Sequence, residues 1–541
     1  MSEPKSEPST GVRLAEVIGA LSIATDLAMG QPVAFALRSC AIAVKLAETL
    51  GCDEAQRAQV YYQALLRYVG CNADTDAFAA LFGDELAMRR DFAIIDAGNV
   101  VEVMRLAAKH IARAAADAGR LRMAGLVAQR LLAAPAITRA GFTAHCEVAQ
   151  RLAERLEMGP EIVTALGQLY ERWDGRGLPN GLRGEAIALP VRVVSLVQDA
   201  VAVFDVSGAA EAIAMVRKRR GAAYDPRIAD AFCRAGAAML ERYAHEPSWD
   251  EMVALEPGER VLLDDERFER ACLAMADFAD LKSPYSGGHS RGVAALASAA
   301  AKCAGLSDED AVALHRAGLL HDIGSVGVSA SIWGKSGALS DAEWERVRLH
   351  GYYTERILAR PAQLARLGAI ATHHHERCDG SGYHRAVNGG ALSPAAKLLA
   401  AADAYRAMLE PRPHRPARAP EDAAAELRRD ARAGRLDADA VAAVLECAGH
   451  RAPRQRRDLV AGLTDRELTV LRLIARGAST KDVAARLGIA AKTADNHVQS
   501  VYAKTGVSTR AGATLFAMER GLLEPEAGDH GAEARAAQPQ A

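Results

Sequence analysis

Histidine and aspartate side chains recur at intervals between residues 289 and 403 of this 541-residue chain, and eight of its 15 histidines lie between 289 and 384. Imidazole nitrogens and carboxylate oxygens are ligands that Mn, Fe and Zn accept. The surrounding segments are apolar with helical periodicity, so these polar residues fall at helix ends, where several helices can meet. Histidines scattered over surface and core would not recur in this way. The array predicts a two-metal centre with these ligands: His289, His321, Asp322, His350, His374, His375 and Asp403.

Two further histidines stand close to the array in sequence. His315 precedes the His321-Asp322 doublet by two helical turns, and we interpret it as a packed helix residue. His373 begins the triple histidine, and we assign it to the surface or to a supporting position beside the ligands.

The elements that must position the array are helices. Alanine is abundant and aromatic residues make up only 5% of the chain, which favours an all-α fold. The length predicts three or four domains, and a net charge of -2 indicates no global field for nucleic acid or membrane. Nine scattered cysteines without a CxxC pair argue against a disulfide framework, and the polar start lacks a signal peptide. We therefore expect a cytoplasmic protein without a membrane partner.

Breaks in the helical pattern divide the chain. Pro-rich or charged stretches fall near 246–260, 411–420 and 449–457, and the last reads as an interdomain linker. The predicted segments are a disordered leader at 1–12, helical domains at 13–245 and 260–450, a C-terminal domain at 458–524, and a disordered tail at 525–541.

The two large segments are related as a repeat. Asp174 matches Asp379 and His145 matches His350, both at a separation of 205 residues, and further landmarks follow in the same order. The segment ALLRYVG at 64–70 matches GLLHDIG at 318–324 at a separation of 254, so the first copy carries about 49 extra residues. Chance similarity of Ala-rich helices would not produce matching DGxG loops in matching order.

The copies differ where chemistry would occur. The first copy has Phe35 for His289, Arg67-Tyr68 for His321-Asp322, and Leu169-Tyr170 for His374-His375. Only His145 and Asp199 survive, and two ligands cannot hold a two-metal centre. The first copy should bind no catalytic metal. Three roles stay open for the first copy: ligand binding, pairing with the second copy, or structural support of the second copy.

The second copy resembles the HD-GYP family, a branch of the HD phosphohydrolase superfamily, over about 260–450, and the first copy resembles it in degenerate form. The shared motifs are HD within LLHDIG, a histidine 28 residues on, HHERCDGSGY, the aspartate in AADAYRAM, and RPHR. The resemblance implies a metal-dependent phosphodiesterase, with cyclic di-GMP as the first substrate candidate and iron or manganese as the metals. Two such cations activate a shared water and neutralise charge on the phosphodiester.

Residue roles follow from the same resemblance. His321 and Asp322 would be the catalytic metal ligands, with Asp322 bridging the two ions. The glycines of the DGxG loop would let the backbone approach the substrate closely. The implied substrate-binding residues are Asp379, Gly380, Gly382, Tyr383, Arg412 and Arg415.

The chain departs from the family pattern at three positions. Ser325 stands where the family has a phosphate-binding lysine, His384 replaces the proline of GYP, and Tyr285 stands where three-metal members have a glutamate. We therefore expect two metals rather than three. Two alternatives stay open: a non-catalytic domain that senses a nucleotide or dimerises, and a phosphohydrolase of another nucleotide.

Residues 463–522 have the pattern of a helix-turn-helix. Thr464 and Glu467 form a capping box, Ser479 or Thr480 starts the next helix, and Gly488 opens a tight turn before a third amphipathic helix. An ordinary helical hairpin is the alternative.

The segment resembles the LuxR/NarL-type DNA-binding domain over its full length, which implies a four-helix domain, DNA as a partner and a homodimer. Its third helix, about 491–504, would enter the major groove. Asn496 and Gln499 suit adenine, and Asp495 can accept from cytosine. The implied DNA-binding residues are Lys481, Lys492, Asp495, Asn496, Gln499, Lys504 and Arg510.

Overall fold

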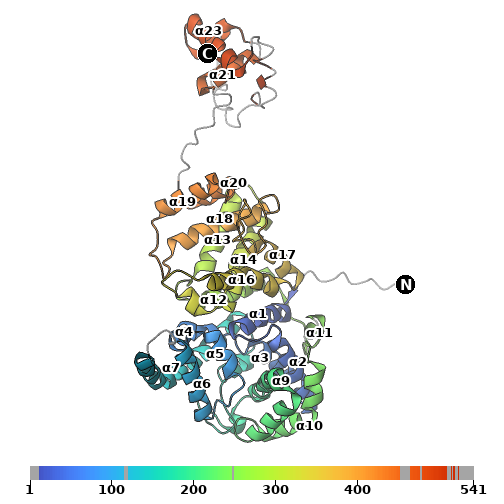
Figure 1. Ribbon diagram of the computed structural model, residues 1–541. Coiled ribbons are helices and arrows are strands. Elements are labelled where there is room, and N and C mark those ends of the chain that lie inside the picture. The colour runs from blue at the N-terminus through green and yellow to red at the C-terminus, as the bar shows by residue number, and fades with distance from the viewer. Residues whose placement is uncertain are drawn as a thin grey trace, which may run out of the picture. The chain divides into compact units, whose positions relative to one another are not determined.

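The structure is a computed structural model that describes residues 11–114, 120–245, 249–450, 463–475 and 478–507, with positions 513, 514, 516, 517 and 522. The chain forms two compact units, Met1–Arg451 and Ala452–Ala541 (Figure 1). The predicted tail and most of the predicted leader and linker lie outside the described residues. Val12, assigned to the leader, instead pairs with Leu263 in a two-stranded antiparallel sheet, β1 (Val12–Arg13) with β2 (Leu262–Leu263).

The described part of the first unit is helical almost throughout, as the composition predicts. Its first half contains α1 (Leu14–Ala28), α2 (Phe35–Thr49), α3 (Glu54–Leu66), η1 (Cys71–Asp74), α4 (Thr75–Phe82), α5 (Glu85–Phe92), α6 (Val100–Ala114), α7 (Arg120–Arg155), α8 (Pro160–Leu166), η2 (Gly184–Ala186), α9 (Leu189–Arg219), α10 (Pro226–Arg242) and α11 (Trp249–Ala254).

The second half has a matching helical order. It contains α12 (Asp265–Asp280), α13 (His289–Cys303), α14 (Asp308–Leu320), η3 (Ile323–Gly327), α15 (Ala330–Trp333), α16 (Asp341–Leu358), α17 (Ala362–Ala371), α18 (Pro394–Leu409), α19 (Pro420–Arg432) and α20 (Ala438–Cys447). Helices α2 and α13 both have 15 residues, and α3 and α14 both have 13. Each pair begins 254 residues apart, the separation found between the sequence motifs.

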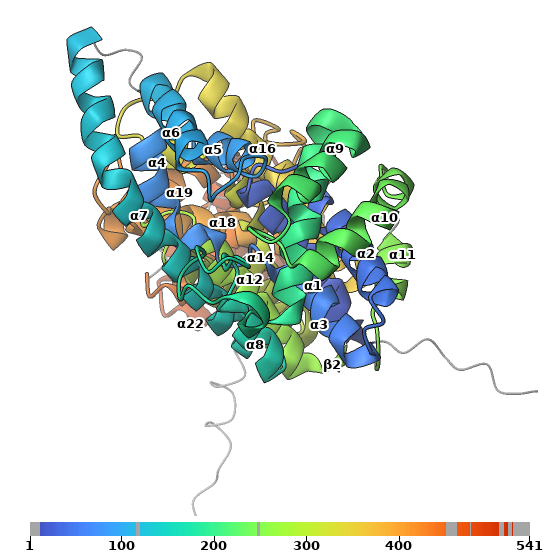
Figure 2. The same cartoon turned by 90° about the horizontal axis from the view of Figure 1, so that it is seen from below.

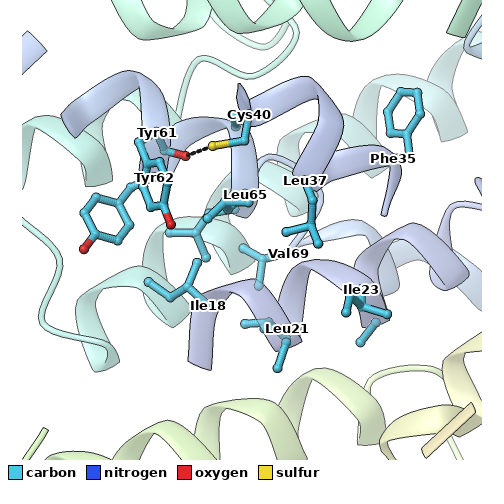
Figure 3. Close-up of a cluster of buried hydrophobic side chains, with 14 of the residues drawn as sticks. Ile18, Leu21, Ile23, Phe35, Leu37, Cys40, Tyr61, Tyr62, Leu65 and Val69 are labelled. Carbon is cyan, nitrogen blue, oxygen red and sulfur yellow. Dashed lines mark hydrogen bonds between the residues drawn. The ribbon is translucent and has the colours of Figure 1, made fainter. Parts of the chain in front are cut away.

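One hydrophobic core joins the two halves. Figure 3 shows part of it, where Ile18 and Leu21 of α1 lie beneath Leu37 of α2 and Leu65 of α3. The same cluster continues into the second half through α12, α14 and the start of η3. Helix α1 contacts both η3 and α16. The first half therefore packs against η3, the turn that follows His321 in the chain.

Helix α9 is the one described helix whose length and hydropathy would suit a membrane span. Its apolar window is 44% buried in the protein, it packs against α2, α3 and α10, and Gly208 breaks its helical geometry with a φ of 83°. These are features of a core helix.

Cys303 at the end of α13 and Cys447 at the end of α20 form a disulfide. This pair departs from the unpaired cysteines expected from the sequence. The two residues are 144 positions apart, so only the packing of α13 against α20 brings them together.

The described part of the second unit includes the short helices α21 (Asp465–Ala475), α22 (Thr480–Leu487) and α23 (Ala491–Thr505). Ser479 caps α22, as predicted, with Asp482 completing the capping box, and Gly488 ends it in the left-handed conformation with a φ of 62°. Val470, Val483 and Val498 belong to the core that these helices share. The expected fourth helix falls mostly outside the described residues.

Candidate metal centre

The seven predicted ligands converge from five helices. Five of them lie at helix ends, as predicted, whereas His350 and Asp403 lie in the middle of their helices. His289 starts α13 after Gly288, which takes a left-handed conformation with a φ of 78°. His321 ends α14, and Asp322 begins the turn into η3. His350 lies within α16 and Asp403 within α18, while His374 and His375 follow α17 directly.

Asp322 lies among three imidazoles. Its Oδ1 is 3.4 Å from Nε2 of His374 and 3.5 Å from Nε2 of His350, while its Oδ2 is 3.8 Å from Nε2 of His321. One carboxylate oxygen thus faces one pair of histidines and the other faces a different histidine. This arrangement suits a carboxylate shared between two cations.

Asp403 occupies the opposite side of the centre. Its Oδ1 is 3.2 Å from Nε2 of His289 and 3.8 Å from Nε2 of His321, and its Oδ2 is 3.7 Å from Nδ1 of His375. Two triplets of ligand atoms, each within 4.8 Å of one another, could each hold a cation: His350 with His374 and His375, and His289 with His321 and Asp322.

Backbone carbonyls orient three of the histidines. The Nδ1 atoms of His321, His350 and His374 each donate to the carbonyl three residues earlier, at distances of 2.5 to 2.7 Å. Because a carbonyl only accepts, each Nδ1 carries the proton and each Nε2 keeps a free lone pair. The Nε2 of His321 is buried and has no hydrogen-bond partner. A buried lone pair of this kind fits a metal ligand.

Glu410 orients the fourth histidine. Its Oε2 is 2.8 Å from Nδ1 of His289. Carboxylates of this kind commonly fix the orientation of metal-binding histidines and raise their basicity. Sequence reasoning missed Glu410, which lies seven residues after Asp403 and directly follows the end of α18 with an extended backbone.

Burial and neighbouring charges shift the pKa values of the groups at the centre in different directions. Burial lowers the pKa of His321 to about 4, which keeps this imidazole neutral and able to bind a metal. Burial raises the pKa of Asp322, but His321 and His374 outweigh it and hold that pKa well below its usual range. Burial lowers the pKa of His289, yet hydrogen bonds to Asp403 and Glu410 raise it to about 10. The buried Asp403 carboxylate and the half-buried Asp322 carboxylate therefore attract positive charge, which divalent ions would supply.

A cavity of about 680 Å³ opens beside this centre. Among the predicted substrate-binding residues, Tyr383, Arg412 and Arg415 line it, whereas Asp379, Gly380 and Gly382 do not. Lys282 and Lys335 also line it, and sequence reasoning missed both. No motif marks these lysines: Lys282 lies seven residues before His289, and Lys335 lies between Asp322 and His350.

The DGxG loop folds back so that Gly382 packs closely against the backbone of Glu376. A Cβ on Gly382 would lie 2.4 Å from Cα of Glu376, so glycine is required for the loop to fold back. The buried Glu376 carboxylate accepts from the backbone amides of Arg385 and Val387 at 2.7 and 3.1 Å. Asp379 accepts from Ser381 within the loop. The loop therefore holds Tyr383 beside the centre, with its ring centroid 4.7 Å from that of His375.

The positions where the chain departs from the HD-GYP pattern have identifiable surroundings. Ser325 and Tyr285 both line the metal cavity. The carbonyl of Ser325 accepts from the Trp333 indole at 3.2 Å. His384 pairs with Glu355 at 2.9 Å.

The histidines assigned supporting positions lie outside that cavity lining. His315 pairs with Glu269 at 3.1 Å on the α12 side of α14. His373 donates to the carbonyl of Ala369 one turn earlier.

The corresponding positions of the first half form a closed hydrogen-bond network. His145 contacts Asp74 through Nε2 at 2.7 Å and the Tyr170 hydroxyl through Nδ1 at 2.8 Å, so both ring nitrogens are engaged. Asp199 accepts from the Tyr224 hydroxyl at 2.7 Å. These residues leave no imidazole lone pair for a metal.

In the second unit, α23 exposes one polar face. Lys492, Asn496 and Gln499 are exposed, and Asp495 is half-buried 3.9 Å from Lys492. Lys481 is exposed at the start of α22. The Lys504 ammonium instead lies 2.7 Å from Glu467, which also closes the predicted capping box with Thr464. Arg510 lies outside the described residues.

Comparison with known proteins assigns the family. The HD domain profile matches residues 131–228 and 274–440. The chain is 30% identical over 427 residues to 3'3'-cGAMP-specific phosphodiesterase 3 of Vibrio cholerae, covering 75% of this chain and 88% of that protein. The chain belongs to the HD-domain family. It is homologous to cyclic dinucleotide phosphodiesterases.

Structural similarity extends over most of this HD-domain protein. A crystal structure of a cyclic GMP-AMP-specific phosphodiesterase from Vibrio cholerae aligns with a TM-score of 0.56 and 25% sequence identity, covering 82% of this chain and 99% of that one. The profile of the bacterial regulatory proteins of the luxR family matches residues 461–517. Over 91 residues the protein is 38% identical to the DNA-binding transcriptional activator DevR/DosR of Mycobacterium tuberculosis, covering 17% of this chain and 42% of that one. The HD-domain protein thus carries a LuxR-type helix-turn-helix domain at its C-terminal end.

Proposed function

We propose that this protein is a metal-dependent cyclic dinucleotide phosphodiesterase whose LuxR-type domain binds DNA as a homodimer in the cytoplasm. The observation that carries the proposal is the convergence of five buried or half-buried imidazoles on Asp322 and Asp403 beside a 680 Å³ cavity. We place 3'3'-cGAMP ahead of cyclic di-GMP as substrate, because the relative that shares most of its length with this chain is named for 3'3'-cGAMP.

The metal ligands of the proposal are the seven residues given above, holding two divalent ions, iron or manganese. Bound there, the ions would activate water and neutralise charge on a phosphodiester. Asp322 and Asp403 are the anionic ligands, and His321, His350 and His374 present their Nε2 atoms to the same space.

Substrate phosphate would meet the cationic side of the cavity. Arg412 and Lys335 line it, each sharing its charge with one carboxylate, Glu410 and Glu343 respectively. Arg415 differs, because it donates to the carbonyls of Ala407, Met408 and Glu410 and so fixes the loop. We therefore assign phosphate contact to Arg412 and Lys335, which compensate for Ser325, and a positioning role to Arg415.

We propose further that residues 13–245 are a degenerate copy of the 260–450 domain, followed by the DNA-binding domain at 458–524. The equal lengths and spacing of α2 with α13 and of α3 with α14 support this. Gly177 supports it too, since a Cβ there would lie 2.4 Å from Cα of Glu171, as at Gly382 and Glu376. The Glu171 carboxylate also caps amides nine and eleven residues on, as Glu376 does.

The deciding experiment measures hydrolysis by the full-length protein loaded anaerobically with Fe²⁺ or Mn²⁺. The probes are 3'3'-cGAMP, cyclic di-GMP and bis(p-nitrophenyl) phosphate, with linear products separated by chromatography. We expect a linear dinucleotide from 3'3'-cGAMP at the highest rate. Metal-loaded protein that cleaves none of the cyclic dinucleotides would refute the enzymatic proposal, and preferential cleavage of another phosphate ester would assign a different phosphohydrolase.

The second candidate function is a non-catalytic nucleotide sensor that controls DNA binding. Ser325 favours it, because a hydroxyl replaces the charge that the family lysine offers to phosphate. A His321→Ala/Asp322→Ala variant distinguishes the two. If it keeps nucleotide-dependent DNA binding, the sensor stands; if that dependence disappears together with turnover, hydrolysis is the function.

A further inference from the structure

A second cavity, of about 430 Å³, lies within the first half of the chain. Residues of α6 and α7, which Figure 2 shows side by side, form part of its wall. Its charged lining is unbalanced, with two carboxylates, Glu171 and Asp199, against six guanidinium groups: Arg67, Arg89, Arg139, Arg172, Arg176 and Arg219.

Arg67 is a buried cation without a described counterion. Its side chain donates to the Ser195 hydroxyl at 2.8 Å, its Nε has no partner, and the residue is only 8% exposed. No carboxylate oxygen of the described residues lies within 4.0 Å of its nitrogens. The Tyr68 ring lies 5.6 Å from its guanidinium carbon, and Asp199 acts on it from beyond ion-pair distance. An anion bound in the cavity would supply the direct ionic partner that Arg67 lacks among the described residues.

The carboxylates of the lining are engaged elsewhere. Glu171 accepts from the backbone amides of Asn180 and Leu182 at 2.7 and 2.8 Å. Asp199 accepts from the Tyr224 hydroxyl, and its nearest guanidinium is that of Arg219 at 3.8 Å. Neither carboxylate lies within ion-pair distance of Arg67. Arg89 and Arg172 pair with Asp74 and Asp96 outside the lining, so among the described residues Arg67 is the buried guanidinium of this lining that has no carboxylate within 4.0 Å.

Aromatic rings stand beside this charge. Phe142 and Tyr170 stack with centroids 4.1 Å apart and an interplanar angle of 13°, and both line the cavity with Tyr68. Guanidinium groups suit phosphate oxygens, and aromatic faces suit nucleobases. The volume lies within the range of small-molecule sites, about 300–1,000 Å³.

We propose that this cavity is a metal-independent binding site for a phosphate-bearing nucleotide, with Arg67 as the buried phosphate contact. Arg67 stands where the second half has His321, so a fixed guanidinium takes the place of a metal-binding group. Because His145 is held by Asp74 and Tyr170, the site needs no metal and performs no hydrolysis.

Helix α5 gives the site a route to the second half. Arg89 of α5 lines the nucleotide cavity. Glu85, one turn earlier in the same helix, pairs with Lys282 at 2.9 Å, and Lys282 lines the metal cavity. Nucleotide bound at the first site is therefore expected to change turnover at the metal centre. This effect on turnover rests on the proposed phosphodiesterase activity. Nucleotide binding itself does not rest on it.

The test is calorimetric titration of the full-length His321→Ala/Asp322→Ala variant in EDTA with GMP, AMP, guanosine and inorganic phosphate. We expect one site per chain for GMP or AMP, with guanosine and phosphate each bound about tenfold more weakly or worse. Arg67→Gln should weaken nucleotide binding by about tenfold or more. Arg38→Gln is the matched control, since Arg38 is equally buried at 8% in the same half but pairs with Asp205 away from the cavity. It should leave binding within about twofold of its parent.

Two results would overturn the proposal: no saturable nucleotide binding, or equal binding by the parent and Arg67→Gln. Tight binding of phosphate alone would exclude the nucleotide. Arg219→Gln gives the same binding test should Arg67→Gln fail to fold. Because metals and turnover are absent, failure of the phosphodiesterase proposal would not affect this result.

Discussion

Lys282 and Glu85 form an ion pair that joins the two halves of the first unit. The Nζ–Oε1 distance is 2.9 Å, and the side chains are 1% and 0% exposed. Glu85 also accepts from the Ser329 hydroxyl at 2.6 Å and the Ala330 amide at 2.9 Å. Burial raises the pKa of Glu85, but Lys282 and Ser329 outweigh it and lower that pKa. One carboxylate of α5 thus organises both the rim of the metal cavity and the turn after η3.

Glu85→Gln should destabilise the protein and slow turnover together. Removing one partner of a buried pair leaves Lys282 uncompensated, which costs about 3–5 kcal/mol. Denaturant unfolding measures the stability loss, and product formation measures the rate. Asp277→Asn is the control, because Asp277 pairs with Arg155 and Arg291 at the surface between the halves. It should cost only about 1 kcal/mol or less, and equal losses in both variants would contradict a special role for Glu85.

Asp322→Asn should remove metal while leaving the fold intact. The carboxylate lies among His321, His350 and His374, so its neutralisation affects both ion positions. Metal analysis should fall from about two ions per chain to one or fewer. His373→Ala should keep the parental metal content, since His373 bonds to Ala369 outside the cavity lining. A full metal complement in Asp322→Asn would argue against a bridging role.

Glu410→Gln tests a residue that positions a metal ligand and is not itself a metal ligand. Loss of the carboxylate charge beside Nδ1 of His289 should weaken metal binding roughly 10–100-fold. Competition with a chromogenic chelator measures the affinity. Glu421→Gln, on the surface of α19, is the control and should match the parent protein. An unchanged affinity for Glu410→Gln would show that His289 is held by other contacts.

The DNA-binding unit should lose stability in acid through Glu467. Burial raises the pKa of this carboxyl, but bonds from Lys504, Ser500 and Thr464 lower it to about 2. Its stabilisation is therefore complete above the unfolded pKa, near 4.3, and is lost as the pH falls toward 2. For residues 452–541 alone, which form a compact unit, Glu467→Gln should cost about 1–2 kcal/mol at pH 7, allowing for the partial exposure of Lys504. Thermal melts should show the difference between the two proteins shrinking as the pH falls below about 4 and vanishing below about pH 2.

Asn496 and Lys481 should contribute to DNA binding in different ways, Asn496 to sequence preference and Lys481 to affinity for any DNA. Once binding sites have been selected from random DNA with the full-length protein, Asn496→Ala should lower affinity for the selected site by about 1–3 kcal/mol and relax its sequence preference. Lys481→Ala should weaken selected and random DNA alike and reduce the salt slope by about one. Mobility shifts at several salt concentrations separate these outcomes. If Lys481→Ala weakened binding to the selected site but not to random DNA, base recognition would be assigned to Lys481 and non-specific contact to Asn496.

The sequence alone determined the elements and the ligand types. Helical periodicity and helix caps are local, so the capping residues Thr464 and Ser479 and the α-helical class could be predicted from neighbouring residues. The ligand set could also be proposed, because histidines and aspartates recur within one segment of apolar helices and match the motifs of the HD-GYP family. The proposed repeat supplied an internal comparison, from which the metal array was predicted for the second half.

Tertiary structure decided what depends on packing between distant segments. Glu410 and Lys282 each lie seven residues from a ligand in sequence, yet only the folded chain shows that Glu410 bonds to His289 and that Lys282 and Lys335 line the metal cavity. The pairing of Cys303 with Cys447 arises in the same way. The clearest case is Arg67, which the sequence presents as a lost histidine. Burial beside a cavity, without a described carboxylate partner, turns that substitution into a candidate anion site, because the cost of a buried charge depends on its surroundings.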